Sequence, residues 1–135
     1  MSKVREMAYF MANLEDKPGA LRKILQDLKV KNIGLAGLWG FATQPGKAQL
    51  FVVPKDVGKL RKTWKSSGLL ARAGTGFFIT GADRTGALLK NLEALSDAGV
   101  NIQAIDAIAV GGRFGSFIWV DASKVARAAK VLGVK

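Results

Sequence analysis

The chain has 135 residues, of which 49% are hydrophobic, and 21 Lys and Arg against 10 Asp and Glu give it a formal net charge of +11. Such a composition supports a folded core and excludes a disordered chain, and the length allows one ordinary domain or two small ones. Because His and Cys are both absent, the common general bases, nucleophilic dyads, zinc sets and disulfides are excluded, so we expect no enzyme, cofactor or metal site.

The first predicted element is an apolar strand, MAYFMANL, at residues 7–14. This stretch resembles a short signal sequence, but acidic residues flank it on both sides and no small-residue cleavage site closes it. No apolar run approaches the roughly 20 residues that span a bilayer. We therefore expect a buried strand and a cytoplasmic protein.

The next stretch, LEDKPGALRKILQDL at residues 14–28, predicts a Gly-containing turn followed by an amphipathic helix. Apolar residues recur there at i, i+3, i+4 and i+7, one stripe of a helix: Leu21, Ile24, Leu25 and Leu28. A strand at residues 33–41, a Gly- and Pro-containing turn and a strand at residues 49–53 follow. A second helix with Val57, Leu60 and Trp64 on one face and a strand near residues 69–72 complete this half.

The second half repeats the first. TGADRTGALLKNLEAL, residues 80–95, contains residues that lie 67 positions after an identical residue of the first half: Asp83, Gly86, Leu88, Leu92 and Leu95 follow Asp16, Gly19, Leu21, Leu25 and Leu28. The phrase NIGLAGL from Asn32 is answered by NIQAIDAI from Asn101, 69 positions later, which predicts two extra residues in the second helix-to-strand connection. A constant spacing over so many positions indicates a duplicated unit.

The second copy has the same order of elements. Strands are predicted at residues 76–81, 102–110 and 116–120, with helices over residues 88–95 and 125–132. The last strand would be only VLGVK, or absent. The fold class is therefore α+β, with two ferredoxin-like βαββαβ units, residues 1–72 and 73–135, each an antiparallel sheet with helices on one face.

The third strand of each copy, QLFVV and SFIWV, is apolar at successive positions. A strand with one wet face should alternate, so we expect the helix-free face to be covered as well. The expected cover is another sheet, from the other copy or a second chain, which favours a homodimer formed by sheet or helix pairing. The alternative is that Phe and Trp simply fill a thin core.

The repeated motifs resemble the ACT domain, a small module that binds amino acids and regulates metabolic enzymes. DKPGAL…NIGLAG and DRTGALLKNLEALSDAGVNIQAI carry the resemblance, which covers nearly the whole chain as two tandem copies. The first copy keeps Pro18-Gly19 but shortens Gly-Val-Asn-Ile to VKNI, and the second has Thr85 where Pro is usual. The resemblance implies an amino-acid-binding regulatory protein, an allosteric sensor or a regulatory subunit with a metabolic enzyme as partner.

The turn residues also suit the chemistry of an amino acid. Helix N-termini hold carboxylates, and a Gly there lets a ligand approach the backbone. An Asp can accept from a ligand ammonium, and an Asn can both donate and accept. By these arguments and the resemblance, the expected ligand-binding residues are Leu14, Asp16, Gly19, Ala20, Asn32, Ile33, Gly81, Asp83, Gly86, Ala87, Asn101 and Ile102.

Three alternatives stand beside this hypothesis. The Asp residues can serve only as helix N-caps, and one copy, the first rather than the second, can be a spacer that binds nothing. The ferredoxin-like shape is shared with RNA-binding domains, whose sheet aromatics would be Phe51, Phe117 and Trp119, but their Gly-Phe-rich motif is missing. A subunit that binds an enzyme and no small molecule is the third alternative.

Overall fold

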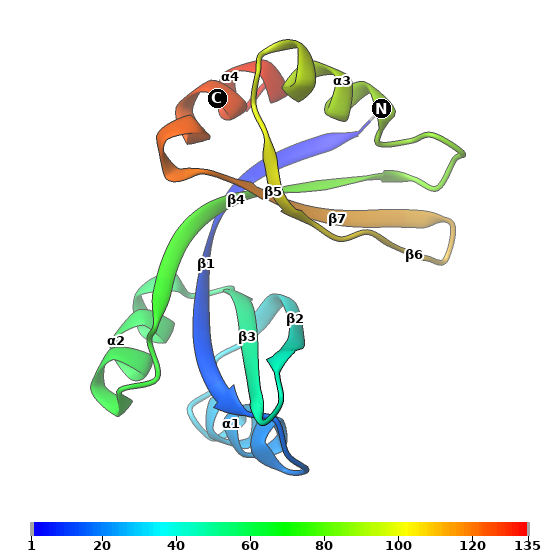
Figure 1. The fold of residues 1–135 in the computed structure, drawn as a ribbon. Coiled ribbons are helices and arrows are strands. Elements are labelled where there is room, and N and C mark those ends of the chain that lie inside the picture. Colours follow the sequence, from blue (N-terminus) through cyan, green and yellow to red (C-terminus); the bar gives the residue numbers. More distant parts are fainter. Residues whose placement is uncertain (1, 135) are drawn as a thin grey trace. The chain divides into compact units, whose positions relative to one another are not determined.

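Residues 2–134 are described by a computed structural model with two compact units, in each of which two helices cover one face of the strands (Figure 1). The compact units are residues 8–74, the first unit, and residues 75–134 together with residues 2–7, the second unit. The sequence-based division lay at 72/73 and kept the N-terminal residues with the first half.

The first unit follows the predicted βαββαβ order. Its sheet has the order β2-β3-β1-β4, and the β1·β3 and β2·β3 pairs are antiparallel. The elements are β1 (Lys3–Glu15), α1 (Ala20–Val30), β2 (Leu35–Gln44), β3 (Lys47–Pro54), α2 (Val57–Ser67) and the start of β4 (Arg72–Ala82).

The second unit has the same arrangement, in the order β5-β7-β4-β1, with the short strand β6 also pairing with β7. Its remaining elements are α3 (Leu89–Asp97), β5 (Ile102–Ile105), β6 (Ile108–Val110), β7 (Arg113–Val120), a 3-10 turn (Ala122–Lys124) and α4 (Val125–Leu132). The predicted fold class, α+β with two βαββαβ-like antiparallel units, is confirmed.

The fourth strand of the second unit comes from the N-terminus. The sequence predicted VLGVK or no strand, but α4 runs to Leu132 and ends at Gly133, whose φ of 80° is left-handed. The first part of β1 lies beside β4 instead, and Val4 packs against the core of the second unit. Without this segment β4 would be an unpaired edge in that unit.

Strand β4 replaces two predicted strands, at residues 69–72 and 76–81. The chain is one continuous strand from Arg72 to Ala82. A Cβ at Gly74 would come within 2.6 Å of the Tyr9 hydroxyl, so the glycine allows Tyr9 to lie against the strand. Strand β4 therefore ends one unit and begins the next without a linker.

Each unit has its own core between the sheet and its helices. Alternate strand residues face the helices, as the period of two requires. The first core is formed by Phe10, Ala12, Ile24, Leu28, Ile33, Leu50, Val52, Leu60 and Trp64. The second is formed by Phe77, Ile79, Leu95, Val100, Phe114, Ile118, Val120, Ala128 and Leu132.

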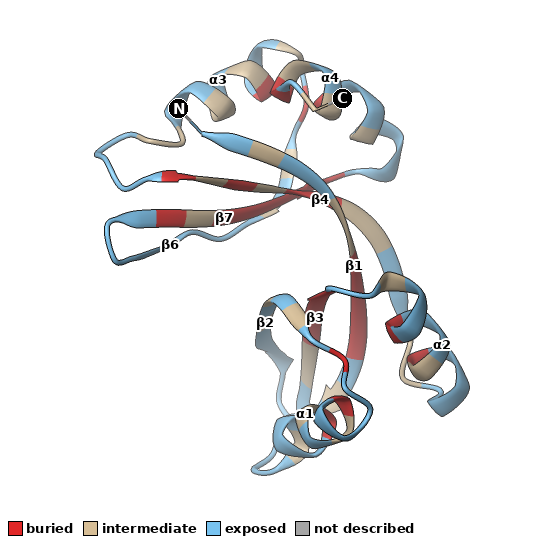
Figure 2. Ribbon diagram, turned by 180° about the vertical axis from the view of Figure 1, so that it is seen from behind, coloured by how far each residue is buried: buried red, intermediate tan, exposed pale blue. Residues whose placement is uncertain are grey.

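The intervening strand residues, which point away from the helices, are buried as well. Phe51 is 1% exposed, Phe117 2% and Trp119 7%, and buried positions run along β1, β3 and β7 (Figure 2). Trp39 and Phe41 stack on Phe51 with ring centroids 5.5 and 5.8 Å away. The successive apolar residues of the third strands thus correspond to burial on both faces.

The sequence predicted that the 67-residue offset between the two copies ends with the helix. In the structure, the offset continues through the turn that follows the helix. The Asn32 and Ile33 N–H groups donate to carbonyls three and five residues earlier, and Gly99 and Val100 do the same. Asn32 is therefore the counterpart of Gly99, with left-handed φ angles of 56° and 71°, and not of Asn101. The predicted two-residue insertion is wrong, because the repeated Asn-Ile pair is not structurally equivalent.

The second strand differs between the units. β2 is continuous over ten residues, whereas the strand predicted at 102–110 is broken into β5 and β6. Asp106 causes the break: its carboxylate accepts the Phe117 N–H at 2.8 Å, and its carbonyl accepts the Ser116 hydroxyl at 2.5 Å. No helix in residues 2–134 is long and apolar enough to cross a membrane.

Candidate ligand cavities at two matching turns

The predicted Asp residues occupy equivalent places in the two units. Asp16 follows β1, and its N–H donates to the Gly46 carbonyl at 3.1 Å. Asp83 follows β4, and its N–H donates to the Gly112 carbonyl at 2.9 Å. In each unit the backbone of this turn is thereby fixed to the tip of the following hairpin, and its carboxylate is exposed.

Neither Asp caps its helix. α1 begins after Gly19, with φ of 89°, and α3 begins after Leu88, and neither helix has a side-chain cap. In the structure of residues 2–134, the carboxylates of Asp16 and Asp83 accept no hydrogen bond. Capping, the alternative role for these residues, is therefore absent.

The backbone amides of the turns are less available than the sequence predicted. The Ala20 N–H donates to the Lys17 carbonyl at 3.3 Å, and the Ala87 N–H donates to the Arg84 carbonyl at 3.0 Å. These amides close the turn itself. These two N–H groups are therefore not free to hold a ligand.

A cavity of about 260 Å³ opens at the first turn. It brings together Leu14, Asp16 and Ala20 of the predicted set, whereas Gly19 is exposed and does not line it. The other lining residues come from the rest of the turn, α1 and the β2–β3 hairpin: Glu15, Lys17, Leu21, Leu38, Gly40, Phe41, Ala42, Ala48, Gln49 and Leu50.

A larger cavity of about 450 Å³ opens at the second turn. It brings together Asp83, Gly86 and Ala87 of the predicted set. Gly86 has a left-handed φ of 76°, so it makes the bend that precedes α3. Arg84, Leu88, Leu89, Leu92, Ala107, Ile108, Ala109 and Phe114 complete the lining.

The other predicted residues lie elsewhere. Asn32 and Ile33 line a cavity of about 310 Å³ at the C-terminal end of α1, which has eleven residues and is therefore roughly 16 Å long. Asn101 and Ile102 stand at the start of β5 and line neither turn cavity. Gly81 lines a third cavity, which lies beside α3 and α4. Within a unit, the turn Asp and the strand Asn are thus not brought together.

Several solved structures share this fold. Protein BT0572 from Bacteroides thetaiotaomicron matches with a TM-score of 0.81 at 24% identity, over 96% of this chain and 88% of that chain. The regulatory subunit of aspartate kinase from Thermus thermophilus, in its ligand-free form, matches with a TM-score of 0.63 at 18% identity, over 98% and 94%. The corresponding subunit from Thermus flavus gives 0.59 at 17%, over 98% and 94%. The chain has the fold of two tandem ACT domains.

This result confirms the resemblance at the level of the fold. No protein-family model matches the sequence, and neither does any curated protein. At these identities, the shared architecture does not show whether this chain binds a ligand. The side chains at the two turns must carry that argument.

The two ACT units differ in the charge at the turn. In the first unit, Lys17 and Glu15 form an ion pair of 2.8 Å, which lowers the pKa of the Glu15 carboxyl and raises the pKa of the Lys17 ammonium. In the second unit, the counterpart of Glu15 is Ala82, and in residues 2–134 no ion pair involves Arg84. Among residues 2–134, the Arg84 guanidinium of the second unit therefore has no ion-pair partner, unlike the Lys17 ammonium of the first.

The sequence-based reasoning missed two groups of lining residues. Arg84 is the basic position of the repeated Asp-basic-x-Gly motif, so the repeat itself contained the signal. Ala107, Ile108 and Ala109 come from the hairpin, 24 to 26 residues after Asp83, and only the fold brings them to the turn. Phe114 reaches the same cavity from β7.

Proposed function

We propose that this protein is a regulatory protein that binds a free amino acid at the turn cavity of its second ACT unit. The observation that carries the proposal is that Asp83 and Arg84, adjacent in sequence, both line a cavity of about 450 Å³ whose remaining lining is mainly aliphatic. An anionic and a cationic side chain next to an apolar cavity match the three parts of an amino acid.

Each charged group has a defined role in this proposal. The Asp83 carboxylate accepts from the ligand ammonium, and the Arg84 guanidinium donates to the ligand carboxylate, for which its planar fork is suited. Both side chains are exposed and make no hydrogen bond within residues 2–134, so binding breaks no existing contact. The arrangement favours the zwitterion over a simple acid or amine.

The apolar lining selects the ligand side chain. Leu88, Leu89, Leu92 and Ile108 supply aliphatic surface, and the cavity has no hydroxyl or amide side chain that would reward a polar substituent. Burying an aliphatic ligand side chain stabilises the complex by about 25 cal/mol per Å² of apolar area. We therefore propose a ligand with an aliphatic side chain.

The first ACT unit is the weaker candidate for ligand binding. Its cavity is smaller, about 260 Å³, and its cation is already paired with Glu15. A ligand carboxylate would have to compete with that ion pair. We propose that this unit keeps the ACT fold and contributes little or no ligand binding.

Regulation requires a surface that responds to the ligand. The hairpin and helix residues around the second cavity include exposed aliphatic side chains, Leu89 at 57%, Ile108 at 69% and Val110 at 75%. Because β5 and β6 lie at the open edge of their sheet, a second copy of this chain or a partner enzyme can pair there. A ligand that binds the assembled form more tightly shifts the protein toward it.

Two alternatives receive less support. The aromatic residues that an RNA-binding sheet would need, Phe51, Phe117 and Trp119, are buried and therefore cannot stack on bases. A subunit that binds an enzyme and no small molecule is favoured by the exposed aliphatic edge. It differs from the sensor in one respect only, the response to a ligand.

The test is a thermal-shift screen of individual amino acids on the full chain, followed by the variants Asp83→Ala and Arg84→Ala. One or a few aliphatic amino acids should raise the melting temperature, and either variant should remove the shift. Asp16→Ala, the matched change in the first unit, should keep it. If no amino acid at millimolar concentration raises the melting temperature, the subunit function replaces the sensor.

A further inference from the structure

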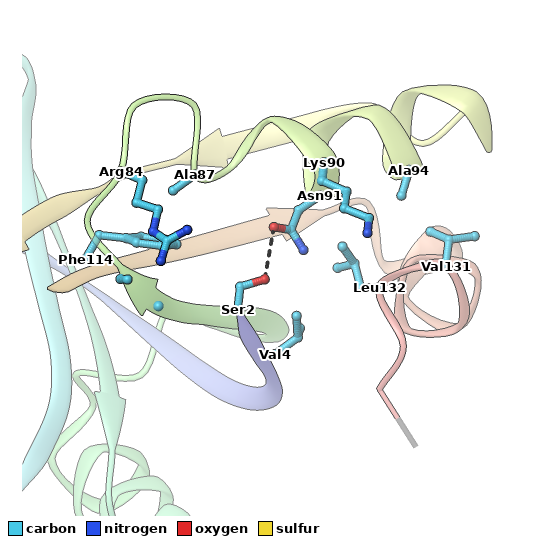
Figure 3. A pocket seen from close by; sticks show the side chains of 12 residues that line it. Ser2, Val4, Arg84, Ala87, Lys90, Asn91, Ala94, Phe114, Val131 and Leu132 are labelled. Carbon is cyan, nitrogen blue, oxygen red and sulfur yellow. Dashed lines mark hydrogen bonds between the residues drawn. The ribbon is translucent and has the colours of Figure 1, made fainter.

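The second ACT unit contains another cavity, between α3, α4 and the N-terminal part of β1 (Figure 3). Its volume is about 440 Å³. It shares Arg84, Ala87 and Phe114 with the turn cavity, but its other lining residues are its own: Ser2, Val4, Gly81, Ala82, Lys90, Asn91, Ala94, Val131 and Leu132. The amino-acid proposal above uses none of these nine residues.

Asn91, which lines this cavity, is polar, whereas the equivalent residue of the first copy, Ile24, is apolar. The apolar stripe of α1 is Leu21, Ile24, Leu25 and Leu28, of which Ile24 and Leu28 are buried, and in α3 the position of Ile24 is taken by Asn91. Its only side-chain hydrogen bond within residues 2–134 is accepted from the Ser2 hydroxyl at 3.4 Å, so its amide N–H donors are unused. An amide on the inner stripe of a helix costs stability unless it gains a partner.

The first unit shows that the fold does not require this cavity. At the positions 67 residues earlier, Leu14 and Ile24 stand where the second unit has Gly81 and Asn91. The last core residue of α2 is Trp64, fully buried, whereas that of α4 is the smaller Leu132. Large apolar side chains thus fill the first unit where small or polar ones leave space in the second.

The lining has a polar and an apolar part. Lys90 extends its side chain past Asn91, Arg84 lies at the other end of the cavity beside Phe114, and Val4, Val131 and Leu132 form an aliphatic wall (Figure 3). No lining residue is acidic. A cation beside an amide, without a carboxylate among the lining residues, favours an anionic group.

We propose that this cavity is a second ligand site, which takes a small molecule with an anionic head and a compact apolar tail. The head, a carboxylate or a phosphate, accepts from Lys90 and the Asn91 amide. The tail lies against Val4, Val131 and Leu132. Because Val4 lies in β1 and Ser2 directly precedes this strand, an occupant also holds the N-terminal segment in the second unit.

The experiment titrates the full chain with hexanoate and with hexyl phosphate, while proton–nitrogen NMR spectra follow the Asn91 side-chain amide and the Gly81 and Ala94 backbone amides. One of the two probes should shift these signals saturably, and the difference between them identifies the head group. Hexanol and inorganic phosphate alone should bind at least about tenfold more weakly, because each lacks half of the recognition.

The variants distinguish binding at this site from binding at the turn cavity and from non-specific attraction to the positive charge of the protein. Lys90→Ala should weaken binding by about tenfold, whereas Lys23→Ala, its counterpart on α1, should leave it unchanged. Asn91→Ile, which restores the residue of the first unit, should abolish binding and raise the melting temperature. Asp83→Ala should not affect it, so loss of amino-acid binding and loss of this site are distinguishable.

Three results would overturn the proposal. The first is that neither probe shifts the Asn91 amide signal. The second is that Lys23→Ala weakens binding as much as Lys90→Ala. The third is that Asn91→Ile lowers the melting temperature and leaves binding intact. The first means that the cavity holds no anion. The second means that only the overall charge attracts the probe, and the third means that Asn91 has a purely structural role.

Discussion

The first unit takes all its strands from one continuous segment, residues 8–74, whereas the second borrows its fourth strand from residues near the N-terminus. The two units share the order of elements, the left-handed helix ends and the bond from turn to hairpin. They differ in how fully the space under the helices is filled and in whether the turn cation is paired. The duplication therefore separates what the fold requires from what a ligand site requires.

The largest expected difference concerns core filling. Trp64→Ala removes a fully buried side chain and should destabilise the protein by about 3–5 kcal/mol. Leu132→Ala, at the matching helix position beside an existing cavity, should cost less, at about 2 kcal/mol. Urea unfolding followed by circular dichroism measures both. Equal costs would mean that the second unit is as tightly packed as the first.

The borrowed strand gives the next largest effect. Val4→Asp places a carboxylate against the second core and should cost about 2–3 kcal/mol. Hydrogen exchange should show faster amide exchange in β4, β7 and α4, whereas α1 and β3 keep their protection. Faster exchange in α1 alone would contradict the assignment of this strand to the second unit.

A smaller effect on stability is expected at the C-terminal ends of α1 and α3. Asn32 has a left-handed φ of 56°, at the position where the second unit has Gly99. Asn32→Gly should stabilise the protein slightly, and Gly99→Asn should destabilise it by a similar amount, each by at most about 1 kcal/mol. Thermal unfolding of the two variants measures this. A destabilising Asn32→Gly would show that Asn32 has a side-chain role beyond its backbone angle.

The smallest effect concerns the charge at the first turn. Because Lys17 lowers the pKa of Glu15, the ion pair stabilises the folded state above the ordinary Glu pKa of 4.5 and loses its contribution as the pH falls through the lowered value. Lys17→Ala should move the pKa of Glu15 back up, as measured by NMR titration of its side-chain carboxyl carbon. Both groups are exposed, so the melting temperature at neutral pH should hardly change.

Much of the fold could be predicted because the repeat imposes it. The 67-residue offset, the apolar stripe from Leu21 to Leu28 and the βαββαβ order all follow from local periodicity. The borrowed strand could not be predicted, because pairing between distant segments leaves no local signal. The Asn-Ile pair misled the alignment, since Asn32 is placed by its backbone angle and Asn101 only resembles it in sequence.

The candidate site was predictable in part. Asp16, Ala20, Asp83, Gly86 and Ala87 do line the turn cavities, because residues adjacent in sequence remain adjacent at a turn. The expected role for Asn at the far end of the helix required a contact across its length, which the helix geometry does not allow within one unit. Only the hairpin, folded back onto the turn, supplies the remaining wall.

The shared strand β1 also bears on how the protein is made. Residues 3–7 leave the ribosome before any other part of the second unit, yet their place beside β4 exists only after more than half the chain has followed. During synthesis, the β1 residues from Ala8 onward can pair within the first unit, while residues 3–7 remain unpaired until β4 has been made. We therefore expect the first unit to form its sheet before residues 3–7 pair in the second unit.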